Sequence, residues 1–376
     1  MTDSAGAIRA SLFALAVVVA PVVAAAQQDP TVAAAPTDPN EGLLGQFSAR
    51  LAYNSEWGPI LGLGFTSNRF LGQNQKFSFS GEVSKDSSRY AFAYDNPDMF
   101  GTNPAFSLGI YRNATQANDI FTFDTVSYGI EPRATWQLSA DRSLTVFAGW
   151  SRDTVENLVA GGSAILAADL GDRTRGALGL RFRQQFEGGS FAFSTEYDSA
   201  SDDSRFVKSL ASLSYRWQPD GGAVVIDSGV KAGTIAMSQG NSNVGDRFFL
   251  GADAVRGFAF GGFGPRDLNA GNAALGGNNY VAARIDAYFP KLFSQVDWFI
   301  PGVFLDVGSL WGLDNVNGGP AGANPVDDSQ IWRSSVGLSM QFHVGPGALR
   351  VFVANPINPQ SYDQTQNVQV TFDARF

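Results

Sequence analysis

Apolar and polar residues alternate one by one along many segments of this chain, and the polar set includes charged residues. Near the start, Phe47, Ala49, Leu51 and Tyr53 alternate with Ser48, Arg50 and Asn54. Further apolar sets of this kind are Phe77/Phe79/Val83, Leu144/Val146/Ala148/Trp150, Leu178/Leu180/Phe182, Val207/Ala211/Leu213/Tyr215/Trp217 and Val336/Leu338/Met340/Phe342. Successive side chains of a strand point to opposite faces, so the pattern predicts β-strands with one apolar and one polar face.

Alternation alone fits either a soluble sandwich or a transmembrane barrel, and composition favours the barrel. Charged residues make up 16% of the chain, below the roughly 25% of a typical soluble domain. Mean hydropathy is −0.06, and beyond the N-terminal segment no apolar run reaches the ~20 residues that a spanning helix needs. A chain of this kind crosses a membrane only as a closed barrel, whose apolar face meets lipid and whose polar face lines a wet lumen.

The first 46 residues predict export followed by a tether. Arg9, the apolar run Ala10–Ala20 and the small residues Ala24–Ala26 are typical of a signal peptide, with cleavage before Gln27. A membrane anchor is the alternative, but the run is short and is interrupted by Pro21. We therefore expect a signal peptide at 1–26, a disordered tether at 27–46 and a barrel at 47–376. The absence of Cys suits export to an oxidising compartment.

We expect about sixteen strands, because the alternating segments predict that number of strand centres. The centres fall near residues 50, 64, 79, 92, 109, 131, 149, 180, 194, 212, 230, 284, 305, 339, 351 and 372. An even number places both chain ends on one side of the membrane, the periplasmic side in bacteria. Turn residues near 72–74, 96–98, 187–189 and 219–222, and longer stretches such as 114–124, 156–172, 238–278 and 312–330, predict that short and long connections alternate. We expect the long ones on the outer side of a bacterial outer membrane.

The last strand, Val368–Phe376, carries apolar residues on one face up to the final position. Phe372 and Phe376 belong to that face. A terminal strand that ends in this way is typical of barrels inserted into the outer membrane. We interpret these two aromatics as an insertion signal.

The longest connection, 238–278, carries the most informative charge of the chain. It contains Val255–Arg256–Gly257–Phe258, and two alternating segments follow it. In the second of them Val303, Leu305 and Val307 would face lipid, which places Asp306 in the lumen with space beside it at Gly308. By the same parity Arg284 and Asp286 face the lumen. A Gly-rich loop that folds inward could present Arg256 to these carboxylates, which a guanidinium binds in a bidentate manner. The alternative is that Arg256 and Arg266 are ordinary solvated loop charges.

These segments resemble the BamA/TamA superfamily of outer-membrane barrels. Val255–Arg256–Gly257–Phe258 is similar to the loop motif of that superfamily, and Phe304–Leu305–Asp306–Val307–Gly308 is similar to its partner motif on the barrel wall. Other parts that resemble the superfamily are Gly276–Gly277–Asn278 with Asp286, Trp57–Gly58, Asn68–Gly72 and Asp95–Pro97. The resemblance covers nearly all of 47–376.

The resemblance implies that Arg256 locks onto Asp306 in the lumen, with Asp286 as a second acceptor. It also implies a weak seam between the first strand, Phe47–Asn54, and the last, Val368–Phe376. A seam that opens exposes strand edges on which a client strand can be added. Insertases of the superfamily carry periplasmic POTRA modules before the barrel, whereas this sequence has only a short tether there. The expected partners are therefore outer-membrane lipid, client outer-membrane proteins and a POTRA-bearing protein.

No motif predicts catalysis, a cofactor or a metal site. The sequence has no G-x-S-x-G, P-loop, HExxH or paired-Cys pattern, and its single His, His343, lies on a predicted strand. With a net charge of −9 we expect no nucleic-acid partner. Two functions remain open: assistance to protein insertion or translocation at the outer membrane, or a passive pore or surface-antigen barrel whose loop plugs the lumen.

Overall fold

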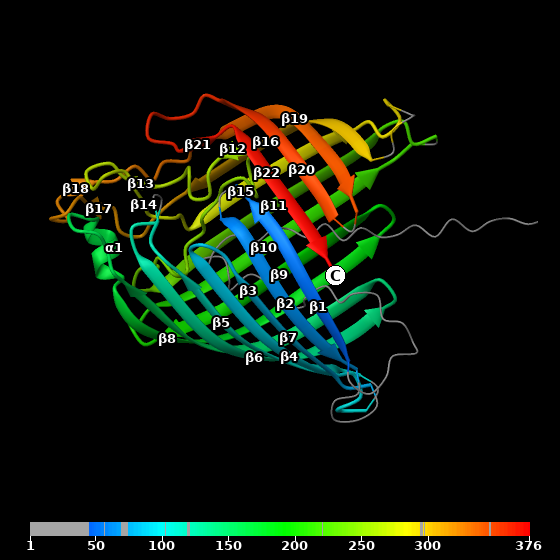
Figure 1. Ribbon diagram of the computed structural model, residues 1–376. Helices are drawn as coiled ribbons and strands as arrows, with labels where there is room; N and C mark the ends of the chain where they lie inside the picture. Colours follow the sequence, from blue (N-terminus) through cyan, green and yellow to red (C-terminus); the bar gives the residue numbers. More distant parts are fainter. Residues whose placement is uncertain are drawn as a thin grey trace, which may run out of the picture.

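The computed structural model is a closed antiparallel β-barrel (Figure 1). It describes residues 45–376 except 56, 69–73, 102, 119–120, 220, 294–295, 297 and 346, and only the backbone of Arg375. The expected signal peptide, nearly all of the tether and most of the Asn68–Gly72 motif lie outside the described residues. Within the described part of the chain, no helix combines the length and apolar character needed to span a membrane.

Sixteen strands form the wall, as the alternating segments predicted, and every predicted centre lies within one of them. They are, in order around the barrel, β1 (Gln46–Asn54), β2 (Gly58–Ser67), β3 (Lys76–Val83), β4 (Ser87–Asn96), β5 (Ala105–Thr115), β6 (Asp124–Ser139), β7 (Arg142–Glu156), β8 (Gly171–Phe186), β9 (Gly189–Ala200), β10 (Arg205–Trp217), β11 (Val225–Gln239), β15 (Asn279–Tyr288), β16 (Phe299–Trp311), β19 (Arg333–Val344), β20 (Gly347–Ile357) and β22 (Val368–Arg375).

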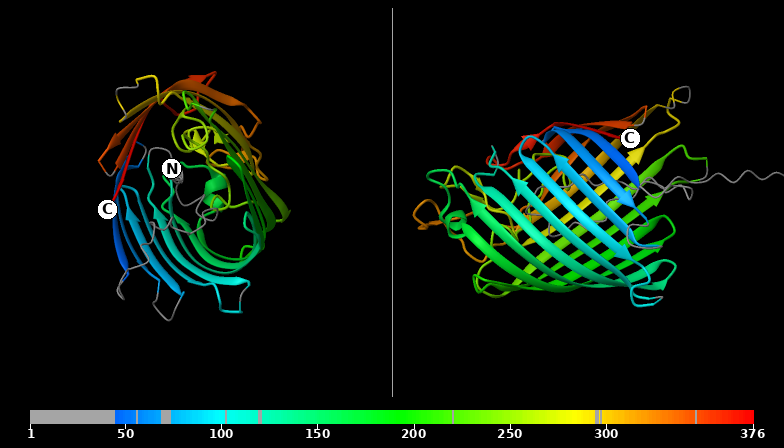
Figure 2. Two further views of the ribbon diagram at one scale, coloured as in Figure 1. Left: turned by 90° about the vertical axis from the view of Figure 1, so that its right-hand side faces the viewer. Right: turned by 60° about the horizontal axis from the view of Figure 1, so that its bottom comes forward.

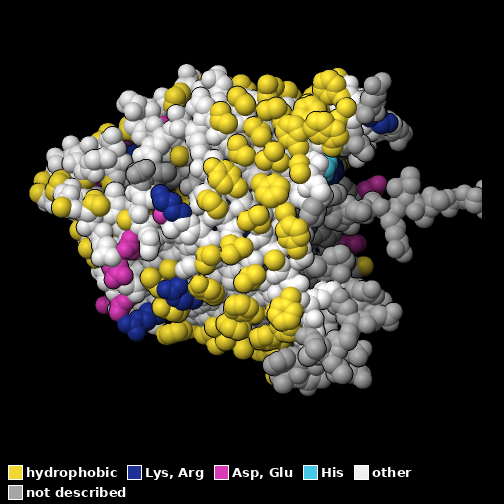
Figure 3. Space-filling view, in the orientation of Figure 1, with side chains coloured by type: hydrophobic (Ala, Val, Ile, Leu, Met, Phe, Trp, Pro, Cys, Tyr) yellow, Lys and Arg dark blue, Asp and Glu magenta, His cyan; other side chains and the backbone are white. Residues whose placement is uncertain are grey.

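The two faces of the wall have the predicted polarity. The residues assigned to the apolar set face outward and are solvent-accessible in the isolated chain, for example Phe47, Leu178 and Leu338, which are 80%, 63% and 55% exposed. On the face seen in Figure 3, apolar side chains form a broad band. The residues assigned to the polar set face the interior. A soluble sandwich would bury the apolar set, so the outward band excludes that alternative.

Small elements between the barrel strands gather at one end of the barrel, which we call the plug end (Figure 1). They are the helix α1 (Ala164–Ala168) and the short strands β12 (Gly257–Phe258), β13 (Arg266–Asp267), β14 (Ala273–Ala274), β17 (Asn317–Gly318), β18 (Asn324–Pro325) and β21 (Thr365–Gln366). The C-terminus lies at the opposite end, which we call the terminal end (Figures 1 and 2). Loop residues 240–278, the plug loop, run inside the ring of strands in the end view of Figure 2.

The predicted alternation of short and long connections holds only in part. From β5 onward most long connections lie at the plug end, but the first two hairpins reverse the pattern. β1 with β2 and β3 with β4 are joined at the plug end by very short stretches of sequence, whereas longer stretches separate β2 from β3 and β4 from β5, whose facing ends lie at the terminal end. The tight turn after β1 places Trp57 in an apolar cluster under the plug loop. A neighbouring loop therefore covers this part of the mouth, and the hairpin needs no long loop of its own.

Candidate functional site: a plug loop held inside the barrel

Strand parity sets up the acceptor side of the site. β15 and β16 are paired so that Arg284 lies opposite Asp306, and Asp286 lies opposite Phe304. Val303 and Leu305 are exposed on the outer face, whereas Phe304 and Asp306 are buried on the inner face. The lumenal positions predicted for Asp286 and Asp306 are therefore the observed ones.

Arg256 of the plug loop reaches both carboxylates. Its Nε and one terminal nitrogen donate to the two oxygens of Asp306, each at 2.7 Å, and its backbone N–H donates to the same residue at 2.9 Å. The guanidinium also donates to the two oxygens of Asp286, at 2.5 and 3.1 Å. Arg256 is 1% exposed and Asp306 is 0% exposed. Such fork-to-fork, charge-assisted pairs are strong where water is excluded, because little solvent competes for either charge.

Aromatic rings enclose the guanidinium. Its central carbon lies 3.7 Å from the centroid of the Phe304 ring and 5.1 Å from that of Phe352 on β20. A cation over an aromatic face is attracted by the ring quadrupole, most strongly when it is desolvated. The sequence motif pointed to Phe304 but not to Phe352. The alternation of residues could have identified Phe352. It is an aromatic residue at an inward position between Val351 and Val353, where a polar residue would be expected.

Two glycines of the motifs make room for this contact. A Cβ on Gly308 would lie 2.8 Å from a methyl carbon of Val255, so any larger residue at position 308 would clash with the plug loop. Gly257 has φ of +92°, a region that residues with a Cβ rarely adopt, and a Cβ there would meet Pro356 and Ala354 at about 3 Å. Phe258 is fully buried against Phe263. The Val255–Phe258 and Phe304–Gly308 motifs therefore form one complementary contact.

A second arginine, Arg284 on β15, also approaches the carboxylate of Asp306. Nε of Arg284 lies 3.6 Å from Asp306, and one of its terminal nitrogens donates to the carbonyl of Asp253 at 3.0 Å. Arg266, the other arginine considered in the loop, is buried and donates to the carbonyls of Gly261 and Asn272. Burial lowers the pKa of Arg266 to about 10, because a charged guanidinium is poorly solvated there. The interpretation of Arg256 and Arg266 as solvated loop charges is therefore wrong.

The first and last strands close the barrel, as the resemblance implied. β1 pairs with β22 from Arg50↔Arg375 to Asn54↔Thr371, and Ala49 and Phe376 exchange both backbone hydrogen bonds beyond that register. On the lumenal side Arg50 of β1 donates to Asp373 of β22 and to Glu82 of β3. Phe372 lies opposite Tyr53 in the outer apolar band, and Phe376 is exposed at the terminal end.

The plug loop touches the elements on both sides of this seam. β12 of the loop pairs with β21, the short strand that leads into β22, through Gly257↔Gln366 and Phe258↔Thr365. On the other side, the ring of Phe260 lies 5.8 Å from that of Trp57, in the turn between β1 and β2. Both contacts join distant loop residues without any periodic pattern, so neither could be predicted from the sequence.

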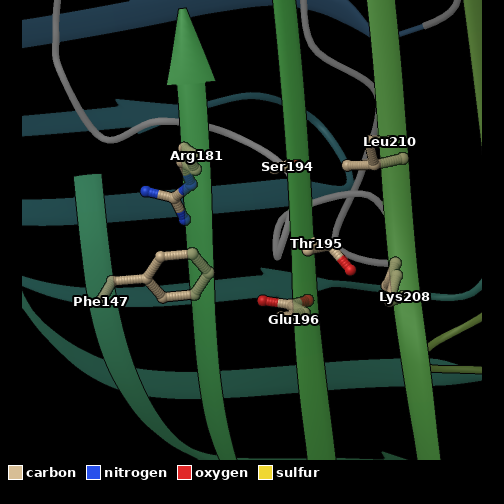
Figure 4. A pocket seen from close by; sticks show the side chains of 7 residues that line it. All are labelled: Phe147, Arg181, Ser194, Thr195, Glu196, Lys208 and Leu210. Atoms are coloured by element: carbon tan, nitrogen blue, oxygen red, sulfur yellow. The ribbon is translucent and has the colours of Figure 1, made fainter. Parts of the chain in front are cut away.

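Below the plug the wall carries further polar groups. Arg181 donates to both oxygens of Glu131 at 2.9 and 3.2 Å, and its guanidinium lies over the ring of Phe147 (Figure 4). A small cavity beside them is lined by residues of β7 to β10, among them Glu196 and Lys208 (Figure 4). The ammonium of Lys208 donates to the carbonyl of Asp246 at 2.8 Å, which links this part of the wall to the plug loop.

The arrangement offers no evident reaction centre. Within the described residues no group of three or more His, Asp or Glu side chains could hold a metal ion. The side chain of His343, on the inner face of β19, makes no hydrogen bond to a Ser or Asp in that part of the chain. What the geometry can do is hold a loop in the lumen by buried charge pairs.

Comparisons with known proteins agree with the barrel fold. Residues 69–376 match the family described as the Omp85 superfamily domain. No curated protein sequence matches the chain. A similar solved structure is BamA from Haemophilus ducreyi lacking POTRA domains 1–3, with a TM-score of 0.74, 17% identity, and coverage of 89% of this chain and 71% of that one.

Two CdiB structures are also similar. CdiB from Acinetobacter baumannii has a TM-score of 0.56 and 13% identity over 88% of this chain, and CdiB from Escherichia coli has 0.54 and 16% over 91%. The chain spans 59% and 64% of these two structures, less than two thirds of each. At such identities the likeness shows the fold, whereas the family match extends over most of the sequence. The chain therefore belongs to the Omp85 superfamily, in agreement with the resemblance that the loop and wall motifs carried.

Proposed function

We propose that this protein is an outer-membrane barrel that assists the insertion or translocation of other proteins, and that Arg256 holds its plug loop as a lock. The observation that carries the proposal is the burial of Arg256 between Asp306 and Asp286. A solvated arginine would not fix the position of its loop. Arg256 makes four hydrogen bonds through its guanidinium and one through its backbone N–H to two lumenal carboxylates, and these five bonds together fix one loop position. The likeness to BamA and CdiB barrels supports insertion or translocation as the class of function.

The lock bears on the seam because the plug loop contacts both of its sides. The β12–β21 pairing ties the loop to the element before β22, and the Phe260–Trp57 contact ties it to the β1–β2 turn. Movement of the loop would therefore loosen the plug end of the seam. An unpaired strand edge is a template for a client strand, so we propose that release of Arg256 accompanies exposure of that edge.

Export and location are part of the same proposal. The apolar outer band fits a lipid environment, residues 1–26 fit a signal peptide cleaved before Gln27, and Phe372 and Phe376 fit an insertion signal. Detection of the mature chain in an outer-membrane fraction, with Gln27 as its first residue, would support these assignments. A mature chain that stays dissolved in periplasmic extract would contradict them.

A reconstituted insertion assay tests the function. Proteoliposomes that contain this barrel should accelerate the folding of unfolded client barrels relative to empty liposomes, and Arg256→Ala should change the rate several-fold. Arg152→Gln is the matched control, because it removes an arginine whose partner Asp172 lies on the exposed outer face. If no client folds faster with the wild-type barrel, the insertase proposal fails. Co-purification of a POTRA-bearing protein would identify the partner implied by the resemblance.

A passive plugged barrel is the second candidate, and the apolar packing at the plug end favours it. Trp57, Phe121, Phe249 and Phe260 belong to one buried cluster together with residues of α1. A mouth filled in this way would conduct ions poorly. Planar-bilayer recordings distinguish the two candidates: in a passive barrel Arg256→Ala would raise conductance, while neither the wild type nor the variant would fold clients.

A further inference from the structure

A row of arginine and tyrosine side chains crosses the outer face of β4 to β7. Arg112 lies opposite Tyr90 on β4 and Tyr128 on β6, and Tyr128 lies opposite Arg152 on β7. The neighbouring outward row, toward the terminal end, is wholly apolar and exposed: Phe92, Ile110, Ile130 and Trp150. The arginines therefore lie at the edge of the apolar band that is nearer the plug end.

Arg112 differs from the other arginine of the row in its partners. Its Nε donates to the hydroxyl of Tyr128 at 3.4 Å and a terminal nitrogen donates to that of Ser88 at 3.3 Å, while its guanidinium lies 5.6 Å from the centre of the Tyr128 ring. These groups are neutral. Arg152, in contrast, pairs with Asp172 at 2.5 Å. Across the described part of the chain, no carboxylate forms an ion pair with Arg112, so its charge faces outward without compensation.

An uncompensated guanidinium is unfavourable on a lipid-facing surface, and the penalty falls toward the headgroups. The group best suited to offset it there is phosphate, because two of its oxygens match the planar fork of arginine. Tyrosine is favoured at the same depth, since its ring suits the apolar side and its hydroxyl the wet side.

We propose that Arg112, oriented by Tyr128 and Ser88, binds the phosphate of an anionic lipid headgroup in the leaflet on the plug side. The site requires the membrane location proposed above but is independent of insertase activity. Because the charge of Arg112 is positive and uncompensated, the site favours a headgroup with net negative charge. A zwitterionic headgroup, whose own cation neutralises the phosphate, is a poorer ligand.

Native mass spectrometry of the delipidated full-length barrel in detergent measures this binding, with phosphatidic acid as the probe. Phosphatidylcholine and a diacylglycerol hemisuccinate with the same acyl chains serve as comparisons for charge and for phosphate. Wild-type protein should bind phosphatidic acid most tightly. Arg112→Gln should weaken that binding roughly tenfold, the effect of one charge-assisted pair, and Tyr128→Phe should weaken it less. Arg152→Gln should leave it unchanged.

The possible outcomes distinguish failure of the lipid-binding site from failure of the proposed membrane location. If Arg112→Gln, folded as judged by heat-modifiable migration on gels, binds phosphatidic acid as tightly as the wild type, the site does not exist. Equal binding of the hemisuccinate would show attraction to charge alone and would overturn phosphate recognition. A chain that remains dissolved without detergent would instead contradict the membrane location.

Discussion

Two arginine–carboxylate pairs of the lumen have nearly the same geometry but differ in burial. Arg256 of the plug loop holds Asp306 through two contacts of 2.7 Å, and Arg216, near the end of β10, holds Asp227 through two contacts of 2.6 Å. The first pair is closed off from solvent, whereas the side chain of Arg216 is 53% exposed. Charge pairs differ far more through burial than through distance, because water screens one pair and not the other. The two pairs therefore have different tasks: the buried pair fixes a loop, and the exposed pair borders a wet part of the lumen.

The largest effect should come from breaking the buried pair. Asp306→Ala leaves Arg256 buried with only Asp286, and loss of one partner from a buried pair costs about 3–5 kcal/mol. We expect a large drop in the urea midpoint of unfolding, measured in detergent micelles. Asp286→Ala should have a smaller effect, because the carboxylate of Asp286 accepts two of the five hydrogen bonds and lies closer to solvent. An equal effect of the two substitutions would argue against Asp306 as the main acceptor.

The attachment of the plug loop to β21 gives the next prediction. A Cβ on Gly262 would lie 2.4 Å from the carbonyl oxygen of Gln364, which accepts a backbone hydrogen bond from Ala259 of this loop. Gly262→Ala should destabilise the protein by about 1–3 kcal/mol through overpacking. Faster hydrogen exchange at Thr365 and Gln366 would report separation of β12 from β21.

Gly149→Ala is the control for this substitution. Gly149 also lies on the lumenal side, but a Cβ there meets only Ala177 at an ordinary 3.4 Å. It should leave exchange at β21 unchanged. If Gly262→Ala also leaves exchange at β21 unchanged, the loop is not fastened there as the structure indicates.

The plug end should also respond to pH. Burial raises the pKa of Asp169, which follows α1, to about 6, although Arg247 and the backbone N–H of Val244 oppose the shift. A carboxyl whose pKa is higher in the folded state than its ordinary 3.8 binds more protons when folded, so the plug end gains stability as pH falls from about 6 toward 4. The slope is at most about 1.4 kcal/mol per pH unit.

Hydrogen exchange of the amides of α1 as a function of pH measures this change locally, after correction for the intrinsic exchange rate. Asp169→Asn mimics the neutral side chain and should abolish the dependence in this window. A profile that keeps its slope in Asp169→Asn would assign the titration to another group.

The difference between the regular wall strands and the irregular plug end explains how much the sequence could predict. Wall strands have one face toward the interior and one toward the outside, so the alternation of polar and apolar residues predicted each of them. The same alternation then assigned Asp286, Asp306 and Gly308 to the inner face. Arg256 followed from the resemblance of its motif and from its place in the longest connection. The plug end has no such period: its core joins Trp57, Phe121 and Phe260 from separate loops, and its Arg333–Asp363 pair joins β19 to the loop before β21. Contacts between irregular segments far apart in sequence leave no local pattern, so only the structure revealed them.

The smallest effect is expected from breaking the exposed pair, and it tests the comparison most directly. Arg216→Gln removes a bidentate pair whose hydrogen-bond distances match those of Arg256 with Asp306. Exposed pairs contribute roughly 0–1 kcal/mol, because water solvates both charges when they separate. We expect the urea midpoint of Arg216→Gln to lie close to that of the wild type, under the conditions used for Asp306→Ala. A loss comparable to that of Asp306→Ala would mean that water is excluded from the Arg216–Asp227 pair as it is from the Arg256–Asp306 pair, and that burial does not distinguish the two pairs.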